Sequence, residues 1–424
     1  MLSSAGMARD QPVPALVIAL SDDLPRAVYS INRLCPESLC FVLPESAKPL
    51  VETGIQPRIT QMPRRWDWIV LPDPGSFPSC HMTIAHSLPN LLKTWGVEPG
   101  SLVVDLTGAT PAMAGALSLV AMPFTSRIIS VVSLKEGREG EGITVEGGEG
   151  LWVSSNPWDE AAEVARREGC ELFNRGAFVA AGSRFREIES RVSGGQKPLY
   201  RALHDLADGY DLWERFHYRQ AWEKLKTSSK AMEMASMFGG PPGLKPIVAA
   251  IRANAGFLEK VVLDPAEIKD LLAQDLLAHA SRRLRVVNDP EGAMQSLIRA
   301  LEAFAQRELF QRHKIKTWDV RPEQLPHALQ EICRTCYLDD IDGKYKLPLQ
   351  GQFRVLAGLG DQMGQAFLRE WPTMKPLLDA ANHAVLGHGH ELVKPERVQQ
   401  FYDVVVKLTG VPDSALPKFP VLTL

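Results

Sequence analysis

The sequence has no long apolar run and no excess of charge of either sign. No stretch of about 18 consecutive apolar residues occurs, so the sequence predicts no membrane-spanning helix. The N-terminus also lacks the apolar segment of a secretory signal peptide. With 47 basic and 50 acidic residues, no general basic field favours nucleic-acid binding, and any RNA contact must be local. We therefore expect a cytoplasmic protein without a membrane partner.

Cysteine is scarce. The six cysteines stand at positions 35, 40, 80, 170, 333 and 336, too few and too scattered for a disulfide framework. Cys333 and Cys336 have the spacing of a redox pair or of half a zinc site, but no second pair lies nearby. Because the surrounding segment, 327–337, has a helical pattern, we expect buried thiols and no metal.

A glycine-rich dinucleotide fingerprint is missing. No Gly-x-Gly-x-x-Gly follows the first predicted strand, Ala15 to Leu20, which disfavours a nucleotide-dependent dehydrogenase. A chain of 424 residues is too long for one ordinary core, so two or three domains are expected. We place the boundaries at 1–155, 156–198 and 199–424.

Residues 1–155 alternate between strand and helix patterns. The predicted strands are 15–20, 39–43, 58–62, 68–71, 102–106 and 128–132, and the predicted helices are 25–34, 81–95 and 113–120. This order predicts an α/β domain with a mostly parallel sheet and helices on both faces. Ligands of such sheets bind outside the carboxyl ends of the strands.

Two small loops follow strands at that edge. The apolar strand Leu102 to Leu106 leads into a loop with little side-chain bulk, and Pro111 suits the first turn of the next helix. Backbone N–H groups and two hydroxyls at a helix N-terminus suit a phosphate, although a tight turn of any α/β domain would look similar. The second loop holds Ser21, Asp22 and Asp23, and the first holds Thr107, Gly108, Ala109 and Thr110.

Beyond Pro157 the pattern becomes helical. Residues 134–150, rich in Gly and Glu, are expected to form a solvated hairpin or a boundary loop. We expect 156–198 to be a helical linker, with a helix over 158–192 that breaks near Gly182, and 199–424 to be all-helical. Tyr210, Trp213 and Phe216 are spaced for one helical face, which favours a core stripe over a base-stacking platform.

A second chemical motif lies near the end of the chain. Asn382 and His388 stand six residues apart, and His388 is flanked by Gly387 and Gly389. The glycines predict that His388 lies where a helix ends, with room for a substrate and a pKa range suited to acid–base catalysis. The alternative is a histidine that complements the dipole at a helix C-terminus.

These motifs carry a resemblance. Asp105 to Thr110 resembles the Asp-x-Thr-Gly-Gly-Thr signature of CARF domains, and 378–390 resembles the Arg-Asn-x-Ser-x-x-x-His-Gly motif of HEPN ribonucleases. Segments 209–222 and 299–306 also resemble parts of one CRISPR-associated CARF–HEPN family. The resemblance implies a Rossmann-like CARF sensor domain over 1–155, followed by a helical region that contains the HEPN effector domain.

The family resemblance also implies partners. In type III CRISPR defence, a CARF dimer binds a cyclic oligoadenylate across its two-fold axis, and a HEPN dimer then cleaves single-stranded RNA. The expected activator is a ring of four adenylates rather than six, and no other cofactor is expected. The matching ligand positions are Ser21, Asp22, Thr107, Gly108, Ala109 and Thr110. Pro111 stands where many relatives have a lysine, which removes one phosphate-directed charge.

In HEPN chemistry the RNA 2′-hydroxyl attacks its own phosphate without a metal, and both protomers of the homodimer contribute to the site. The resemblance assigns the acid–base role to His388 and a polar helper role to Asn382, and it puts Ala384 at the motif serine. Ala381 stands at the position of the arginine that steadies the phosphate charge. Losing such a donor typically costs about 10²–10³ in rate.

Three explanations of Ala381 stay open. The arginine was removed on purpose, to keep a ligand intact or to avoid toxicity, or the protein is a natural sensor with a degenerate HEPN domain, or another arginine substitutes. Arg307 and His313 also have a suitable spacing, but they fit a long helix that ends in Arg312, His313 and Lys314. We favour the first explanation. A sensor that sequesters the ring and regulates a partner, or that degrades the ring itself, is the alternative function.

Overall fold

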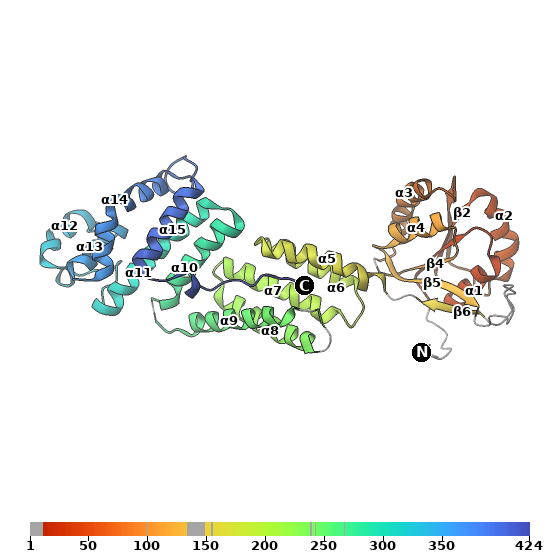
Figure 1. Ribbon diagram of the computed structural model, residues 1–424, viewed down its shortest axis with the longest axis horizontal. Helices are drawn as coiled ribbons and strands as arrows, with labels where there is room; N and C mark the ends of the chain where they lie inside the picture. Colours follow the sequence, from red (N-terminus) through yellow and green to blue (C-terminus); the bar gives the residue numbers. More distant parts are fainter. Residues whose placement is uncertain are drawn as a thin grey trace. The chain divides into compact units, whose positions relative to one another are not determined.

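The two halves of the chain fold differently, an α/β part followed by an all-α part, as the sequence predicts. The computed structural model describes residues 12–98, 100–133, 149–153, 156–237, 240–241, 243–266 and 268–424. The chain divides into a sheet unit, residues 1–165 and 187–197, and a helical unit, residues 166–186 and 198–424. Figure 1 shows the sheet in the first and stacked helices in the second.

The sheet unit is built on six strands in the order β3-β2-β1-β4-β5-β6. Neighbours among the first five pair in parallel, and β6 pairs antiparallel with β5. Because the chain order reverses between β1 and β4, the edge where these strands end is the switch point at which such sheets bind ligands. The strands are β1 Ala15–Leu20, β2 Ser38–Pro44, β3 Arg65–Leu71, β4 Leu102–Gly108, β5 Thr125–Ser133 and β6 Glu149–Val153.

Helices cover both faces of the sheet, as expected. Alternate residues of the fully buried strand β1 point to opposite faces. Ala15, Val17 and Ala19 belong to the core under α3 (Phe77–Trp95) and α4 (Pro111–Ala121), and Leu16, Ile18 and Leu20 to the core under α1 (Leu24–Leu34). A short helix, α2 (Lys48–Leu50), follows β2.

Two details of the sheet differ from the prediction. The expected strand over 58–62 is absent, because irregular helical turns occupy 51–58 and β3 begins only at Arg65. Pro57 and Pro63 flank that segment and supply no ladder N–H groups. The short strand β6 had no strand signal. Most of the Gly- and Glu-rich segment, 134–148, lies outside the described residues.

The helical unit begins with paired helices whose breaks are set by residues in the left-handed region. The break between α5 and α6 falls at Gly176 (φ 78°), not at Gly182, and Phe216 (φ 62°) separates α7 from α8. Tyr210 and Trp213 are fully buried, as the core stripe predicts, but Phe216 is 41% exposed. The helices are α5 Pro157–Asn174, α6 Phe178–Arg191, α7 Lys197–Glu214, α8 Tyr218–Met237 and α9 Leu244–Leu263.

The remaining helices share one continuous apolar core. The rings of Phe353 and Phe367 stack at 4.0 Å between two of them. Cys333 is buried, as expected, but Cys336 is exposed. No helix within the described ranges is long and apolar enough to cross a membrane. The helices are α10 Asp270–Arg282, α11 Pro290–His313, α12 His327–Tyr337, α13 Leu349–Gly358, α14 Gln362–His383 and α15 Pro395–Thr409.

Candidate functional site

The two small loops of the sheet unit meet at the switch point. The Ser21 N–H donates to the Gly108 carbonyl at 2.9 Å, so the loop after β1 is joined to the loop after β4. A Cβ atom on Gly108 would lie 3.2 Å from the Ala19 carbonyl oxygen. The strands therefore approach so closely that any larger residue at position 108 would have to push them apart.

A buried carboxylate fixes the loop after β4. Asp105 is fully buried and accepts hydrogen bonds from the Ser30 hydroxyl on α1, from the Thr107 N–H at 2.8 Å and from the Thr107 hydroxyl. Burial raises the pKa of Asp105, and these three donors oppose the rise because they favour the charged form. Ser30 is a site residue that sequence reasoning missed; its signal is a hydroxyl on the apolar face of a helix.

The two loop hydroxyls are both used inside the fold. The Thr107 hydroxyl, besides donating to Asp105, accepts from the Val131 N–H at 2.8 Å. The Thr110 hydroxyl donates to the Pro74 carbonyl at 2.6 Å and caps α4 by accepting from the Met113 N–H at 3.2 Å. The two hydroxyls are therefore less available to a ligand than the sequence suggests.

The neighbouring loop is acidic. The Ser21 hydroxyl donates to Asp22 at 3.0 Å. Asp23 caps α1 by accepting from the Arg26 N–H at 3.3 Å, and its carboxylate pairs with the Arg26 guanidinium at 3.2 Å. Pro111 supplies no charge either. The positions expected to bind the ring therefore include no lysine or arginine.

In the helical unit, His388 lies on a tight turn after α14. The His388 N–H donates to the Asn382 carbonyl at 2.8 Å, and the Glu391 N–H donates to the His383 carbonyl at 2.9 Å. These bonds satisfy carbonyls that the end of a helix leaves free. The turn, residues 384–391, thus folds back over the C-terminus of α14, which confirms that His388 follows a helix end.

Both glycines beside His388 are required by this close packing. A Cβ on Gly387 would overlap the Ala381 carbonyl oxygen, and a Cβ on Gly389 would overlap the His383 carbonyl oxygen. His388 itself is exposed. Its imidazole therefore projects from a turn whose backbone is pressed against the helix end, in a position open to a substrate.

The residues around His388 divide into an exposed set and a buried set. Asn382, His383 and His390 are exposed, and so is an apolar surface formed by Val385, Leu386 and Leu392, each more than half exposed. Ala381 is only 1% exposed and belongs to the apolar core, as does Ala384. The residue at the motif arginine position therefore faces the core, while its neighbour Asn382 faces solvent.

Arg307 and His313, the second arginine and histidine with a suitable spacing, belong to a helix and its ion pairs. Arg307 pairs with Glu308 at 2.6 Å, and Arg312 pairs with Asp361, the N-cap of α14, at 2.9 Å. Lys314 ends α11 in the left-handed region with φ 56°. This confirms the interpretation of 307–314 as the end of a long helix, which the Arg312–Asp361 ion pair holds to α14.

One group of side chains in the described part of the chain could bring three metal ligands together: His204, Asp205 and Asp208. Lys224 already pairs with Asp205 at 2.5 Å and with Asp208 at 3.4 Å. Arg186 lies 2.5 Å from His204. Because two cations are already bound to these ligands, the group does not suit a metal ion.

Two protein families match segments of the helical part of the chain. The family described as Csm6 HEPN domain matches residues 264–411, and the family described as Csm6 6H domain matches 161–258. The two matched segments follow one another in the sequence, and together they cover more than half of the chain. The fold and these matches define a CRISPR-associated sensor–effector protein. The chain belongs to the CARF–HEPN family, with an N-terminal Rossmann-like CARF domain and a helical HEPN-containing region.

One solved structure shares the fold over nearly the whole chain. Csm6 from Enterococcus italicus, bound to cyclic hexa-2′-fluoro-hexa-dAMP, matches with a TM-score of 0.60 and 12% identity, over 95% of this chain and 96% of that one. Can2 from Sulfobacillus thermosulfidooxidans, in complex with cyclic tetra-adenylate, has 13% identity over 48% of this chain and 66% of its own, with a TM-score of 0.24. No curated protein matches the sequence.

Proposed function

We propose that this protein is a CARF–HEPN ribonuclease of type III CRISPR defence that responds to a cyclic oligoadenylate and cleaves single-stranded RNA weakly. Membership of the family and the fold shared with a ring-bound Csm6 support this. The observation that carries the proposal is the joined pair of loops at the switch point, where the Ser21 N–H bonds the Gly108 carbonyl.

The ring is proposed to lie on these loops in a homodimer, so that each chain contributes one pair to a symmetric ligand. The ligand positions are Ser21, Asp22, Thr107, Gly108, Ala109, Thr110 and Pro111. The Thr107 and Thr110 hydroxyls are engaged, and so are the N–H groups of Ser21, Thr107 and Ala109. The phosphates are therefore proposed to lie at the N-terminus of α4, where the dipole and the first N–H groups of the helix favour an anion. The proposal covers both cyclic tetra- and cyclic hexa-adenylate.

The RNA-cleaving step is proposed at His388. The 2′-hydroxyl attacks the adjacent phosphorus, the bond to the 5′-oxygen breaks, and a 2′,3′-cyclic phosphate and a 5′-hydroxyl result. His388 of the homodimer serves as general acid or base, and Asn382, exposed beside it, holds the phosphate. No metal takes part in this proposal. Without a guanidinium at position 381 the rate falls by about 10²–10³.

A second candidate is a sensor with a degenerate HEPN domain, which sequesters or degrades the ring or regulates a partner. One observation favours it. Ala381 is 1% exposed and packs in the core, so an arginine there would have to run its stem along apolar surface before its charge reached solvent. We expect an alanine to be buried this completely at the motif position only in a HEPN domain that does not use an arginine there.

Cleavage by Ala381→Arg separates the two. For the ribonuclease, we expect ring-dependent cleavage to rise by about 10²–10³, with 2′,3′-cyclic phosphate ends. Ala380→Arg adds the same charge one residue earlier, on a half-buried position, and should change little. Adding His388→Ala to Ala381→Arg should abolish the gain. Thermal unfolding of each variant shows that it is folded. No ring-dependent cleavage by a folded Ala381→Arg would support the degenerate sensor.

A further inference from the structure

Residues 412–424, which we call the C-terminal strap, follow the part matched by the HEPN family, which ends at 411. After α15 the chain makes a short turn over Asp413–Ala415 and then runs along helices matched by the 6H family. Figure 1 shows this last segment leaving α15 and passing beside α7. The strap is therefore in contact with both helical domains.

One aromatic side chain of the strap is inserted between them. The Phe419 ring lies 4.4 Å from the Tyr210 ring and 5.0 Å from the Trp213 ring, both fully buried on α7. The Arg282 guanidinium on α10 lies 4.0 Å over the same ring, within the range of a cation–π interaction. Phe419 thus contacts a 6H helix on one side and the first HEPN helix on the other.

Two asparagines hold the main chain of the strap on the 6H side. The Asn174 side chain donates to the Leu422 carbonyl at 2.9 Å and accepts from the Leu422 N–H at 2.7 Å. The Asn254 side chain donates to the Lys418 carbonyl at 3.0 Å. These side chains satisfy backbone groups that an extended segment would otherwise expose.

The start of the strap is held on the HEPN side. Asp413 accepts from the Tyr402 hydroxyl on α15 at 2.7 Å and pairs with Arg285 at 3.1 Å and with Lys418 at 3.2 Å. The Tyr402 hydrogen bond and these cations lower the pKa of Asp413. Because one end is bonded to HEPN helices and the other to 6H helices, the strap spans the joint between the two domains.

The joint beneath Phe419 is polar and buried. Glu214 at the end of α7 accepts from the Arg282 Nε on α10 at 2.5 Å. Asp275, fully buried on α10, accepts from the Trp213 indole at 3.0 Å and from the Tyr218 hydroxyl at 2.8 Å. Groups of this kind bond strongly only while water is excluded, and Phe419 packs on two of their partners, the Trp213 ring and the Arg282 guanidinium.

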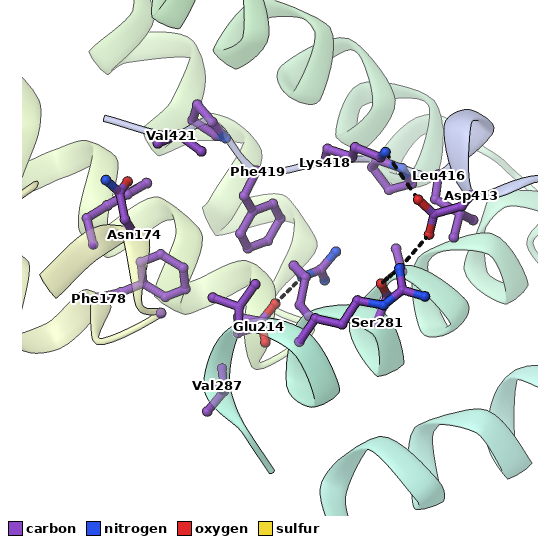
Figure 2. Close-up of a pocket in the computed structure, with 18 residues that line it drawn as sticks. Asn174, Phe178, Glu214, Ser281, Val287, Asp413, Leu416, Lys418, Phe419 and Val421 are labelled. Carbon is purple, nitrogen blue, oxygen red and sulfur yellow. Dashed lines mark hydrogen bonds and ion pairs between the residues drawn. The ribbon is translucent and has the colours of Figure 1, made fainter. Parts of the chain in front are cut away.

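The strap is nevertheless not packed along its whole length. A cavity of about 260 Å³ lies beside it, bounded by Leu416 and Val421 of the strap and by Phe178 and Val287 opposite. Figure 2 shows Phe419 projecting from the strap into the same space as Phe178 and Glu214. Protein interiors rarely leave such gaps, so the strap is held at separate anchors: the buried Leu416 and Leu422, the half-buried Phe419, and the polar bonds at its two ends.

We propose that the C-terminal strap is a releasable latch that locks the 6H helices and the HEPN helices into one cooperative unit, with Phe419 as its anchor. With the latch closed, a movement of the 6H helices is transmitted to the HEPN helices. With the latch open, water reaches Glu214 and Asp275, and the two domains open separately. This goes beyond the proposed function and does not depend on any ligand or activity.

Hydrogen exchange in the full-length protein tests it, with Phe419→Ala and Asn174→Ala as the variants. Phe419→Ala is expected to speed exchange about 10- to 100-fold in the strap, α7 and α10, because the half-buried ring loses its contacts with Tyr210, Trp213 and Arg282, while α11 and α14 keep their protection. Asn174→Ala should affect mainly the end of the strap. The control is Phe185→Ala, which removes a fully buried ring that packs on Gly169 inside the 6H helices.

The control should speed exchange in α5 and α6 and, within the strap, only near Leu422, whose anchor Asn174 ends α5; α10 and the strap from Asp413 to Lys418 should stay protected. The latch is contradicted if Phe419→Ala speeds exchange evenly through the whole helical unit, because the strap is then ordinary core. It is also contradicted if α7 and α10 keep their protection once the strap is exposed, because the strap then rests on the joint without closing it.

Discussion

The Ser30→Ala substitution tests how the loop proposed to bind the ring is held. The Ser30 hydroxyl donates to Asp105, whose carboxylate is fully buried. Removing one donor from a buried charged acceptor costs about 1–3 kcal/mol in free energy of unfolding. Because water does not reach Asp105 to replace the hydroxyl, we expect the upper half of that range, about 2–3 kcal/mol. The loop should also lose order at Thr107, which the same carboxylate binds.

The pH dependence of this cost follows from the pKa of Asp105. Burial raises that pKa, and the Ser30 hydrogen bond lowers it by favouring the charged form. Ser30→Ala therefore raises the folded-state pKa further above the unfolded value. The extra cost is full when the carboxyl is charged, above the folded-state pKa. It shrinks as the pH falls toward the unfolded pKa, where the folded protein carries a neutral carboxyl.

Urea unfolding at several pH values measures this cost, and Ser126→Ala is the matched control. The Ser126 hydroxyl donates to the Leu102 carbonyl at 3.0 Å in the same sheet, so its loss should cost about 0.5–1.5 kcal/mol at every pH. Ser30→Ala should also weaken ring binding, and Ser126→Ala should not. If Ser30→Ala matched the control in size and showed no pH dependence, our account of the buried Asp105 would be refuted.

Three further predictions test the helical unit. Gly389→Ala should destabilise the protein by about 1–3 kcal/mol in thermal unfolding, because its Cβ overlaps the His383 carbonyl. The control is Gly256→Ala, on a helix with open space around it, which should stabilise the protein by about 0.5–1 kcal/mol. Burial lowers the pKa of His279 to about 4, so the unfolded chain takes up the proton first and the free energy of unfolding should fall by about 3 kcal/mol from pH 6.5 to pH 4. His279→Gln should flatten that slope. Asp413→Asn should lower stability at pH 7 and matter less in acid, because the lowered pKa of Asp413 makes its contribution vanish as the carboxylate is protonated.

The sequence predicted the strand–helix order of the sheet unit because its strands are nearly continuous apolar runs. β1 was placed at Ala15–Leu20, the same bounds as in the structure. It did not predict β6, because that strand begins inside the Gly- and Glu-rich segment and is formed by pairing with β5, a contact between segments about 20 residues apart. The strand expected over 58–62 was wrong because the prolines on either side outweigh its β-branched residues.

Local glycine signals were correct only where packing agreed with them. Gly387 and Gly389 correctly predicted a tight turn around His388. Gly182 was mistaken for a helix break, yet it lies inside α6, where a Cβ would be 3.2 Å from the His204 ring. The break between α5 and α6 is made by Gly176, which adopts the left-handed conformation. A glycine that lets helices approach and a glycine that ends one look alike in a sequence.

Orientation around the HEPN motif was not predictable from spacing. Ala381 and Asn382 are neighbours on α14, and which of them faces the core depends on the helices that pack there. The strap gave no signal either, because residues 412–424 contain three prolines and no periodic pattern. Its place is set by Phe419, which inserts among aromatic residues some 200 positions earlier in the chain.

Calorimetric titration of the purified protein with cyclic tetra- and cyclic hexa-adenylate tests the central claim most directly, because it does not depend on position 381. We predict saturable binding of one of the two rings, with one ring per two chains. A linear hexa-adenylate should bind at least about tenfold more weakly, because it loses conformational freedom on closing into a ring shape. The absence of heat with both rings, from a protein that sedimentation shows to be a folded dimer, would contradict the account.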